Sequence, residues 1–337
     1  MAPKRVAING FGRIGRLVLR AAIESGRKDF EFVAVNDLGS PEINAHLLAH
    51  DTVHGRLECE VSSDKDRIRA SGFDLKVLRE PLPRQLPWRE LGIDIVMECT
   101  GRFNDKTEAA SHLAAGAKRV LVSAPSKGAD RTVVYGVNDD ALTSQDTVVS
   151  NASCTTNCLA PVAKVLHEFI GIERGFMTTI HSFTGDQRLL DTFHNDFYRA
   201  RAAGSNLIPT TTGAAKAVGL VLPELDGKLD GTAIRVPTPN VSLVDLKFDS
   251  QRATDPTEIN DAMRAAASGT KLKGVLQVNA APLISSDFNH NPASAVFDLD
   301  GTEVVDGRLC RVMAWYDNEW GFSNRMLDTA AAIGRLI

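Results

Sequence analysis

The sequence predicts an α/β protein with two domains, of which the first contains a doubly wound, mostly parallel sheet. Through the first half of the chain, short apolar runs alternate with segments whose apolar residues recur at helix spacing. After the segment around Cys154 the apolar runs become longer, and fewer helical patterns separate them. A chain of 337 residues is long enough for two hydrophobic cores.

Composition and charge narrow the class of protein. Hydrophobic residues make up 43% and charged residues 24%, as in ordinary globular proteins. A net charge of −4 gives no electrostatic reason to expect nucleic acid or an acidic membrane as a partner. No run approaches the about 18 apolar residues of a spanning helix, and no charged-then-apolar leader precedes the first strand. The five cysteines are odd in number and scattered, which indicates free thiols and a cytoplasmic protein.

A glycine-rich turn follows the first expected strand, Val6–Ile8, and leads into a helical pattern. Glycines between a strand and a helix permit a tight turn, close approach of a pyrophosphate and close helix packing. The helix N-terminus would then face the phosphates. The glycines at this spacing are Gly10, Gly12 and Gly15.

Asp37 follows the second expected strand, Phe30–Asn36, about 20 residues after the last glycine. A carboxylate at that position can accept hydrogen bonds from both ribose hydroxyls of a dinucleotide. The alternative is a turn residue or a helix cap, but the order of strand, glycines, helix, strand and acid favours the ribose contact. Because a carboxylate repels a 2′-phosphate, NAD is expected rather than NADP.

Three histidines at four-residue spacing raise the possibility of a metal site. His46, His50 and His54 enclose Asp51, but Asp51 and Gly55 interrupt the helix that would align them. Since zinc needs three or four converging ligands, we expect polar surface here and no bound metal.

The rest of the first half alternates between strand and helix patterns. Weak alternation and dense prolines indicate hairpins over Glu58–Trp88. Strands are expected at Ile93–Cys99, Arg119–Ser123 and Thr132–Val137, and a helix at Thr107–Ala115. This alternation makes the sheet mostly parallel and doubly wound.

Cys154 lies in the polar segment Ser150–Asn157, between the apolar run Thr147–Val149 and a helical pattern. The cysteine is therefore expected at a helix N-terminus, where the helix dipole lowers a thiol's pKa and favours the nucleophilic thiolate. The alternative is a buried structural cysteine, which is what most free cysteines are. The polar neighbours favour a reactive thiol. Pro161 predicts a kink near Asn157.

Three later positions have side chains suited to catalysis or anion binding. His181 ends the strand Phe176–Ile180, where it is either a polar residue at a sheet rim or a base for the cysteine. Arg235 lies among apolar neighbours and is expected to bind a carboxylate or a phosphate. The threonines of Pro209–Gly213 precede a helix and suit an anion site.

The remaining chain predicts antiparallel pairing and two helices. The strands are expected at Val241–Phe248, Val275–Val278, Ala295–Asp298 and Cys310–Tyr316, and the helices at Pro256–Ala267 and Ser323–Leu336.

Five motifs occur along the whole chain, at Asn9–Gly15, Ser150–Pro161, Pro209–Gly219, Arg235–Ser242 and Trp315–Gly321. Together they closely resemble the phosphorylating glyceraldehyde-3-phosphate dehydrogenase family of bacterial type. The resemblance implies a Rossmann domain over residues 1–152, a catalytic α+β domain with a mostly antiparallel sheet over 153–317, and a C-terminal helix, about 318–337, that returns to the first domain. It also implies NAD, glyceraldehyde 3-phosphate, inorganic phosphate, and a cytosolic homotetramer.

The resemblance also implies roles for individual residues. Cys154 would be the nucleophile that forms a thiohemiacetal and a thioester, and His181 its base, in a glycolytic or gluconeogenic reaction yielding 1,3-bisphosphoglycerate. Thr184 and Arg235 would hold the substrate's C3 phosphate. Inorganic phosphate would be bound by Ser153, Thr155, Thr212 and Gly213. NAD would be bound by Gly10, Gly12, Arg13, Ile14, Gly15, Asp37, Arg79, Ser123 and Asn318, with Asn318 at the nicotinamide carboxamide.

Other interpretations of the same motifs remain open. Erythrose-4-phosphate dehydrogenase shares the cysteine segment and NAD, although Thr210–Gly213 keeps the pattern of the phosphorylating glyceraldehyde enzyme. A non-catalytic NAD-binding redox sensor would use Cys154 only as an oxidisable thiol, but it would not need two anion sites. Thr192-Phe193 replaces a Leu-Pro pair common in NAD-specific bacterial members, so the strictness of NAD preference stays open.

Overall fold

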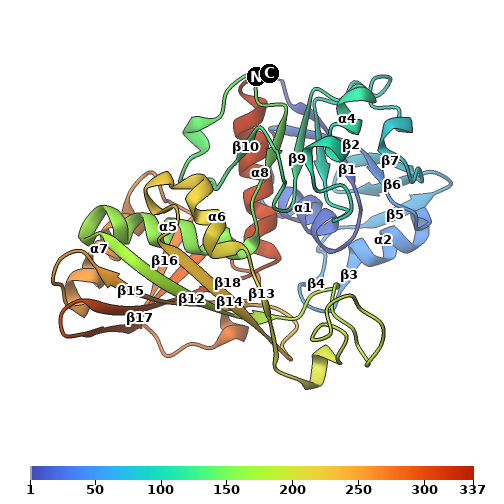
Figure 1. Ribbon diagram of the computed structural model, residues 1–337. Coiled ribbons are helices and arrows are strands. Elements are labelled where there is room, and N and C mark those ends of the chain that lie inside the picture. The colour runs from blue at the N-terminus through green and yellow to red at the C-terminus, as the bar shows by residue number, and fades with distance from the viewer. Residues whose placement is uncertain (1) are drawn as a thin grey trace. The chain divides into compact units, whose positions relative to one another are not determined.

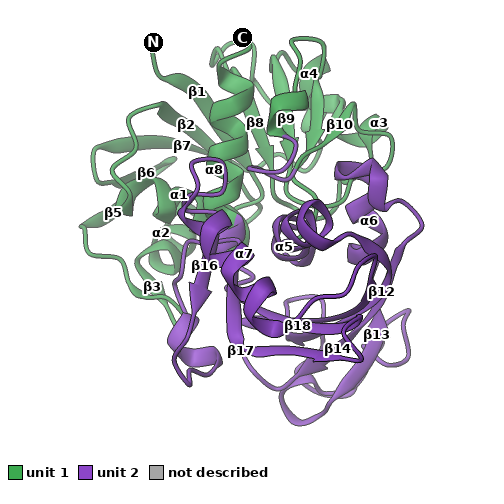
Figure 2. Cartoon of the chain, turned by 90° about the vertical axis from the view of Figure 1, so that its left-hand side faces the viewer, with its two compact units in different colours: residues 1–133, 139–153, 323–337 green, residues 134–138, 154–322 purple. Residues whose placement is uncertain are grey.

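The computed structural model describes residues 2–337, and contacts within the chain divide it into two compact units (Figure 2). Unit 1 comprises the residues up to Val133, together with Asp139–Ser153 and Ser323–Ile337. Unit 2 comprises Val134–Asn138 and Cys154–Phe322. The division before Cys154 lies next to the boundary between residues 152 and 153 that we expected from the sequence.

Unit 1 is built on a nine-stranded sheet with the order β10-β11-β9-β8-β1-β2-β7-β6-β5 (Figure 1). Its strands pair in parallel from β10 to β7, whereas β7, β6 and β5 form an antiparallel meander. The order β7-β2-β1-β8-β9-β11 is that of a doubly wound dinucleotide-binding fold, as predicted. The strands are β1 (Lys4–Asn9), β2 (Phe30–Asn36), β5 (Val61–Asp64), β6 (Arg67–Ala70), β7 (Phe73–Leu78), β8 (Ile95–Glu98), β9 (Arg119–Val122), β10 (Arg131–Thr132) and β11 (Val148–Ser150).

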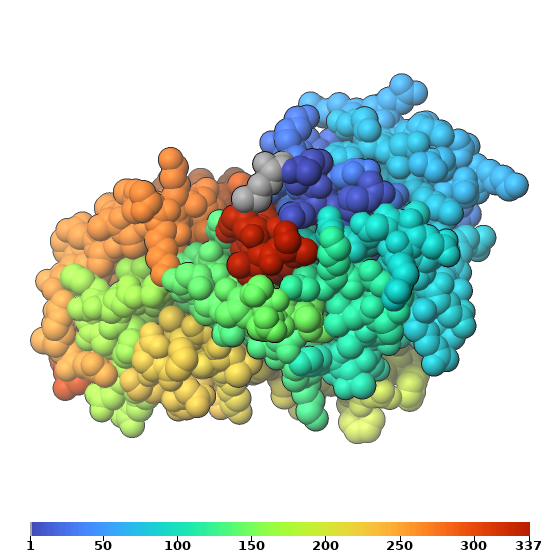
Figure 3. All heavy atoms as spheres, turned by 90° about the horizontal axis from the view of Figure 1, so that it is seen from above, coloured from blue at the N-terminus to red at the C-terminus, as the bar shows by residue number. Residues whose placement is uncertain are grey.

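Helices and a small hairpin complete unit 1. The Lys4 ammonium donates to the backbone carbonyl of Ile337 at 2.8 Å, so the C-terminus lies beside the first strand (Figure 3). The final helix, α8 (Trp320–Gly334), belongs to unit 1 from Ser323 onward. The other elements are α1 (Arg13–Glu24), α2 (Pro41–Ala49), α3 (Lys106–Ala109), α4 (Ser111–Ala114), β3 (His50–Asp51) and β4 (Gly55–Arg56).

Two predicted elements of the first half are wrong in extent. The strand expected over Thr132–Val137 ends at Thr132, because Val134 N donates to the Asn138 side chain and Gly136 turns the chain at a φ of +83°. A left-handed glycine in that position breaks the ladder despite the valines around it. The single helix expected over Thr107–Ala115 is two short helices, α3 and α4.

Unit 2 contains a seven-stranded mixed sheet with the order β13-β14-β12-β15-β18-β17-β16. Two of its pairings, β12 with β14 and β16 with β17, are parallel, and the other four are antiparallel. Three helices pack against its strands, and the first continues through Pro161. The elements are α5 (Cys154–Ile170), β12 (Ile172–Ser182), β13 (Ile208–Thr211), α6 (Ala214–Val221), β14 (Leu229–Val236), β15 (Ser242–Ser250), α7 (Pro256–Ser268), β16 (Leu276–Asn279), β17 (Ala295–Val305) and β18 (Leu309–Tyr316).

The glycine-rich turn between β1 and α1 depends on close backbone packing. A Cβ added at Gly15 would lie 2.1 Å from the Gly10 carbonyl oxygen, and one added at Gly10 would lie 2.6 Å from Thr100 N. A Cβ at Gly12 would meet no atom within 4 Å. Gly10 and Gly15 therefore set how closely the chain packs, whereas Gly12 leaves open space beside it.

We predict that Gly15→Ala lowers the free energy of unfolding by about 1–3 kcal/mol, the usual cost of overpacking, while Gly12→Ala leaves it nearly unchanged. Urea unfolding followed by circular dichroism measures both variants. Equal losses in the two variants would contradict the packing argument.

Candidate active site

Cys154 is the first residue of α5, as predicted. The chain reaches it through Ala152, whose φ of +56° is rare for a residue other than glycine. Ser150 holds this turn, because its hydroxyl donates to the Ala124 carbonyl and accepts from Ala152 N at 3.1 Å. A strained turn therefore follows β11 and directly precedes Cys154.

His181 contacts the thiol of Cys154. Its Nε2 lies 3.5 Å from Cys154 Sγ, and the ring is buried near the end of β12. The structure thus brings together two residues that the sequence alone could not pair. Nδ1 lies 2.7 Å from the Ser182 carbonyl oxygen, and when it donates there Nε2 is left as an acceptor facing the thiol.

The electrostatics of the pair differ from our expectation for the thiol. Burial raises the pKa of Cys154 above its ordinary value, although Arg235 and nearby hydrogen bonds act in the opposite direction. The expected lowering by the helix N-terminus is therefore wrong for the ligand-free chain, since desolvation dominates. Burial, together with the positive charge of Arg235, lowers the pKa of His181 to about 3. At neutral pH both groups are uncharged, and the histidine is a free base.

Arg235 lies on the side of the imidazole opposite the thiol. Parallel pairing of β12 with β14 places it directly across from His181. Its Nη1 lies 2.7 Å from His181 Nδ1 and donates to the Ser182 carbonyl at 3.1 Å. Its Nε is buried and has no hydrogen-bond partner within residues 2–337. This guanidinium therefore retains donor capacity for an anion.

Tyr316 supports the pair from β18. Its hydroxyl lies 2.9 Å from the hydroxyls of both Thr155 and Thr179, and its ring meets the His181 ring edge-on with centroids 5.9 Å apart. The sequence analysis singled out the motif that contains Tyr316 but gave this residue no role. A buried tyrosine needs a partner for its hydroxyl, and the two threonines supply it.

The threonine-rich segment before α6 has open donors. Gly213 is the N-cap of α6 and offers no side-chain cap, and Thr212 Oγ1 accepts from Ala214 N at 3.2 Å. Arg199 comes close to this segment, donating to Thr210 Oγ1 at 3.0 Å and to Asp186 at 2.8 Å. Nothing in the spacing of Arg199 along the sequence indicates that the chain folds back beside Thr210.

The other two residues expected at the phosphate sites lie close to the pair in sequence. Thr184 follows β12, where its backbone N–H donates to the Gln187 side chain at 3.3 Å. Ser153 directly precedes Cys154.

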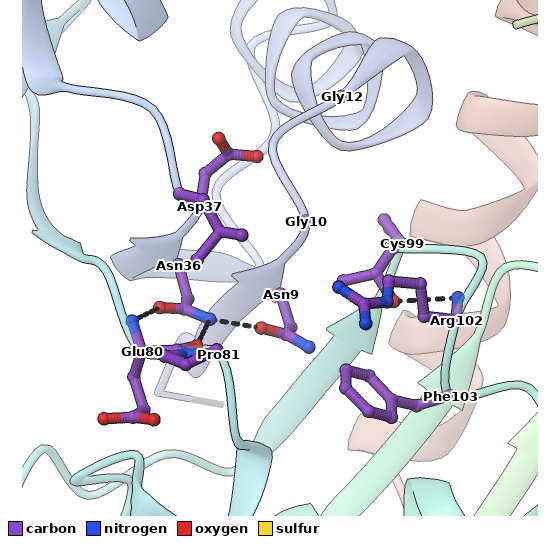
Figure 4. A pocket seen from close by; sticks show the side chains of 12 residues that line it. Asn9, Gly10, Gly12, Asn36, Asp37, Glu80, Pro81, Cys99, Arg102 and Phe103 are labelled. Carbon is purple, nitrogen blue, oxygen red and sulfur yellow. Dashed lines mark hydrogen bonds between the residues drawn. The ribbon is translucent and has the colours of Figure 1, made fainter.

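Unit 1 contains a separate cavity of about 340 Å³ at the carboxyl ends of its parallel strands, where doubly wound folds bind ligands (Figure 4). Gly10 and Gly12 border it, and the open side of Gly12 faces it. Asp37 also borders it and accepts from Phe11 N at 3.0 Å and from Gly39 N at 2.9 Å. Each carboxylate oxygen keeps a second lone pair for a ribose hydroxyl. These residues therefore fit a dinucleotide.

The other residues expected at the cofactor lie on elements around this cavity. Arg13 and Ile14 begin α1, and the Arg13 guanidinium pairs with Asp51. Arg79 follows β7 and donates to the Leu38 carbonyl at 3.1 Å. Ser123 follows β9, and its backbone N–H donates to the Glu98 carbonyl.

A buried polar chain beneath the cavity was not found from the sequence. Trp88 Nε1 donates to His112 Nδ1 at 2.9 Å, and His112 Nε2 lies 3.0 Å from the Glu98 carboxylate. Glu98 also accepts from Asn9 at 2.6 Å, and Asn9 accepts from Asn36 at 2.7 Å. Figure 4 shows the Asn9–Asn36 contact at the edge of the cavity. Because indole can only donate, His112 Nδ1 is the acceptor of this bond.

Asn318 belongs to unit 2. Its Oδ1 accepts from the hydroxyls of Ser182 at 2.8 Å and Ser242 at 2.9 Å. Both lone pairs of the side-chain oxygen therefore accept hydrogen bonds, and the N–H groups of the amide are the donors that can bind a ligand.

The histidines considered as metal ligands do not converge on one point. The rings of His46 and His50 have centroids 4.9 Å apart, and Asp51 pairs with Arg13. Within residues 2–337 no group of three or more histidine, cysteine or acidic side chains could hold a metal ion. The same residues contain no helix long and apolar enough to span a membrane.

The doubly wound fold of unit 1 and the cavity at the carboxyl ends of its strands are typical of a nicotinamide-dependent dehydrogenase. Two family profiles match the chain: "Glyceraldehyde 3-phosphate dehydrogenase, NAD binding domain" over residues 4–106, and "Glyceraldehyde 3-phosphate dehydrogenase, C-terminal domain" over residues 153–318. The chain therefore belongs to the glyceraldehyde-3-phosphate dehydrogenase family.

Full-length relatives agree with this assignment. The chain is 65% identical to a glyceraldehyde-3-phosphate dehydrogenase of Xanthobacter flavus, over 98% of this chain and 99% of that protein. It is 64% identical to one of Cereibacter sphaeroides, over 99% of each chain. A third, from Geobacillus stearothermophilus, is 54% identical over 98% of each chain.

We predict that iodoacetamide alkylates Cys154 of the ligand-free protein slowly at neutral pH, with a rate that still rises above about pH 8.5, the ordinary thiol pKa. The thiolate is the reacting species, and a raised pKa leaves less of it at any given pH. Mass spectrometry of the Cys154 peptide measures the rate, with glutathione as the reference thiol. A plateau near neutral pH would show instead that the thiol is activated without a ligand.

Proposed function

We propose that the chain oxidises and phosphorylates D-glyceraldehyde 3-phosphate to 1,3-bisphosphoglycerate with NAD, as a step of glycolysis or gluconeogenesis. The observation that carries this proposal is the 3.5 Å contact between Cys154 Sγ and His181 Nε2, with Arg235 beside the pair. The names of the full-length relatives support the substrate.

Cys154 attacks the aldehyde carbon, and the thiol proton moves to Nε2 of His181. The resulting thiohemiacetal oxyanion is stabilised by the Cys154 backbone N–H at the start of α5 and by protonated His181. NAD, held by Asp37 and the glycine-rich turn, would supply the acceptor for the hydride of the thiohemiacetal. Inorganic phosphate then attacks the thioester carbon, the Cys154 thiolate leaves, and the acyl phosphate keeps the free energy of oxidation in a reactive group.

Two anion sites serve this chemistry. Thr184 and Arg235 hold the C3 phosphate, and the buried Nε of Arg235, which lacks a partner among residues 2–337, supports that role. The attacking phosphate is held by Ser153, Thr155, Thr212 and Gly213. Gly213 offers no side-chain cap at the start of α6, which supports an anion there, because the N–H groups and the dipole of a helix N-terminus favour negative charge.

The NAD-binding domain in this proposal comprises residues 1–152 and 318–337, and the catalytic domain residues 153–317. Asp37 binds the adenosine ribose, Arg13 and Ile14 the pyrophosphate, and Asn318 the nicotinamide carboxamide. Gly12 gives the pyrophosphate room, Gly10 and Gly15 allow the turn that binds it to pack closely, and Arg79 and Ser123 complete the cofactor site. The free donors of the Asn318 amide suit a carboxamide oxygen.

We further propose a cytoplasmic homotetramer. Segment 189–207 exposes large apolar side chains, which supports burial against another copy of the chain. These side chains are Leu189, Leu190, Phe193, Phe197 and Leu207. All five cysteines are free, as is usual in reducing compartments.

We predict phosphate-dependent NADH formation from glyceraldehyde 3-phosphate, and a loss of several orders of magnitude in Cys154→Ser. Cys158→Ser is the matched control, because Cys158 is buried one helical turn further along α5 and its Sγ faces the Ala314 carbonyl at 3.8 Å. Absorbance of NADH measures turnover.

Three results would contradict this proposal. Turnover without phosphate would contradict the formation of an acyl phosphate. A preference for erythrose 4-phosphate over glyceraldehyde 3-phosphate would favour the assignment as erythrose-4-phosphate dehydrogenase. No turnover with either aldehyde would favour a redox sensor.

We predict that Asp37→Asn weakens NAD binding by about 1.5–3 kcal/mol, the usual contribution of a hydrogen bond to a charged group. Binding of NADP should weaken less, since the substitution removes the charge that repels a 2′-phosphate. Asp94→Asn is the control, because Asp94 pairs with Lys118 at 2.8 Å and is not among the residues that line the cavity. Calorimetric titration measures both nucleotides, and equal weakening of the two would contradict the charge argument.

A further inference from the structure

The carboxyl group of Glu98 lies at the end of β8, and the residue is only 1% exposed. Its Oε1 accepts from Thr100 N at 2.7 Å and from the Thr100 hydroxyl. Its Oε2 accepts from Asn9 Nδ2 at 2.6 Å and lies 3.0 Å from His112 Nε2. Both oxygens of this buried group therefore contact polar atoms of the protein.

The residues that donate to Glu98 belong to two walls of the dinucleotide cavity. Asn9 ends β1 and leads into Gly10, whereas Thr100 follows β8 and leads toward Arg102, and these four residues line the cavity. In the parallel pairing of β1 with β8, Asn9 lies directly opposite Glu98. Figure 4 shows Asn9 and Gly10 on one wall and Arg102 on the other. A single carboxyl group therefore joins the ends of the two strands at which the cavity opens.

The two walls are also packed against each other. A Cβ added at Gly10 would lie only 2.6 Å from Thr100 N, so the glycine turn has no space to move toward the second wall. The Thr100 hydroxyl, which donates to Glu98, accepts from Arg102 N at 3.0 Å. A shift of Thr100 would therefore change both the packing of the glycine turn and the course of the chain toward Arg102.

A carboxylate suits this position, whereas a neutral amide of the same shape does not. Thr100 N, the Thr100 hydroxyl and Asn9 Nδ2 all donate, and a carboxylate accepts at both of its oxygens. In Glu98→Gln the side-chain NH₂ group would face either Thr100 or Asn9, depending on the orientation of the amide. One wall would then place donor against donor, which leaves buried polar groups without a partner.

We propose that Glu98 is a positioning residue for the cofactor: its buried carboxylate holds the two walls of the cavity at the spacing that the adenosine half of the dinucleotide needs. Glu98 is not among the residues that line the cavity, and it acts through Asn9 and Thr100, which are. The inference rests on the proposed contact of Asp37 with the adenosine ribose.

The alternative is that these hydrogen bonds only stabilise unit 1. Trp88 lies at the far end of the same network, where its Nε1 donates to His112 Nδ1 at 2.9 Å. It is fully buried in a core cluster with Ala7 and Val96, and it is not among the residues that line the cavity. Trp88→Phe removes a hydrogen bond of the network without changing a donor on either wall. It is therefore the matched control for a purely structural role.

The test measures binding of AMP and NAD to the full chain by calorimetric titration, with urea unfolding as the measure of stability. We expect Glu98→Gln to weaken both nucleotides by the same factor, about tenfold or more, since a hydrogen bond to a charged group contributes at least that much. Trp88→Phe should lower the free energy of unfolding and keep the wild-type affinity for AMP. In turnover assays Glu98→Gln should raise KM for NAD and leave KM for glyceraldehyde 3-phosphate at saturating NAD unchanged.

A second pair of variants keeps the carboxylate in place, in case Glu98→Gln does not fold. Thr100→Val removes the hydroxyl that donates to Glu98, whereas Thr100→Ser keeps it. We expect weaker AMP binding in the first variant and wild-type binding in the second. Where Glu98→Gln folds, its combination with Thr100→Val should lose less affinity than the sum of the two single losses, because both substitutions affect the same contact.

Three results overturn the positioning role. They are unchanged AMP affinity in Glu98→Gln, equal weakening in Trp88→Phe, and equal AMP affinity in Thr100→Val and Thr100→Ser.

Failure of this inference is distinguishable from failure of the proposed cofactor contacts. If Asp37→Asn weakens AMP binding and Glu98→Gln does not, the ribose contact stands and the positioning role is wrong. If Glu98→Gln weakens AMP binding and Asp37→Asn does not, the proposed ribose contact is wrong and the positioning role stands.

Discussion

The parallel register between β12 and β14 is the constraint on which the catalytic residues depend. His181 lies opposite Arg235 in this ladder, in which Gly175–Ser182 of β12 pair with Leu229–Val236 of β14. A slip of one residue would turn Arg235 to the other face of the sheet. The register is fixed by burial, since Met177 of β12 and Ala233 of β14 are enclosed in the core. The hydrophobic core of unit 2 thereby sets the distance between an imidazole and a guanidinium.

Polar groups buried in such a core need hydrogen-bond partners. These hydrogen bonds fix the orientation of the side chains whose remaining donors can bind a ligand. The Asp317 carboxylate accepts from the Asn240 side chain at 2.8 Å. It also accepts from the backbone N–H groups of Glu319 and Trp320, at the start of α8. These bonds hold the backbone around the adjacent Asn318, whose amide is oriented by two serine hydroxyls. Buried networks of this kind are rigid because each broken contact leaves a buried group unpaired.

The sequence predicted what depends on local pattern. The doubly wound sheet of unit 1, the helix that begins at Cys154 and the glycine turn at Gly10 follow from periodicity and from the steric freedom of glycine. The strand beyond Thr132 was wrong, because Gly136 and the Asn138 side chain redirect a run of valines that looks like a strand. Local turn chemistry overrode the apolar pattern at that point.

Contacts between segments that are far apart in the sequence could not be predicted from local sequence patterns. Arg199 reaches Thr210, and the chain from Trp88 through His112 to Glu98 joins segments that are separate in the sequence. Only the folded register brings these side chains together. The resemblance to a known family supplied the pairing of Cys154 with His181, which spacing alone left as a guess.

Burial of the thiol also bears on the redox-sensor hypothesis. A sensor cysteine needs an exposed thiolate at neutral pH, since the thiolate is the form that peroxides oxidise. Desolvation raises the pKa of Cys154, and the low pKa of His181, about 3, denies it an imidazolium partner. Burial therefore acts against a resting thiolate, which is the form that a sensor needs.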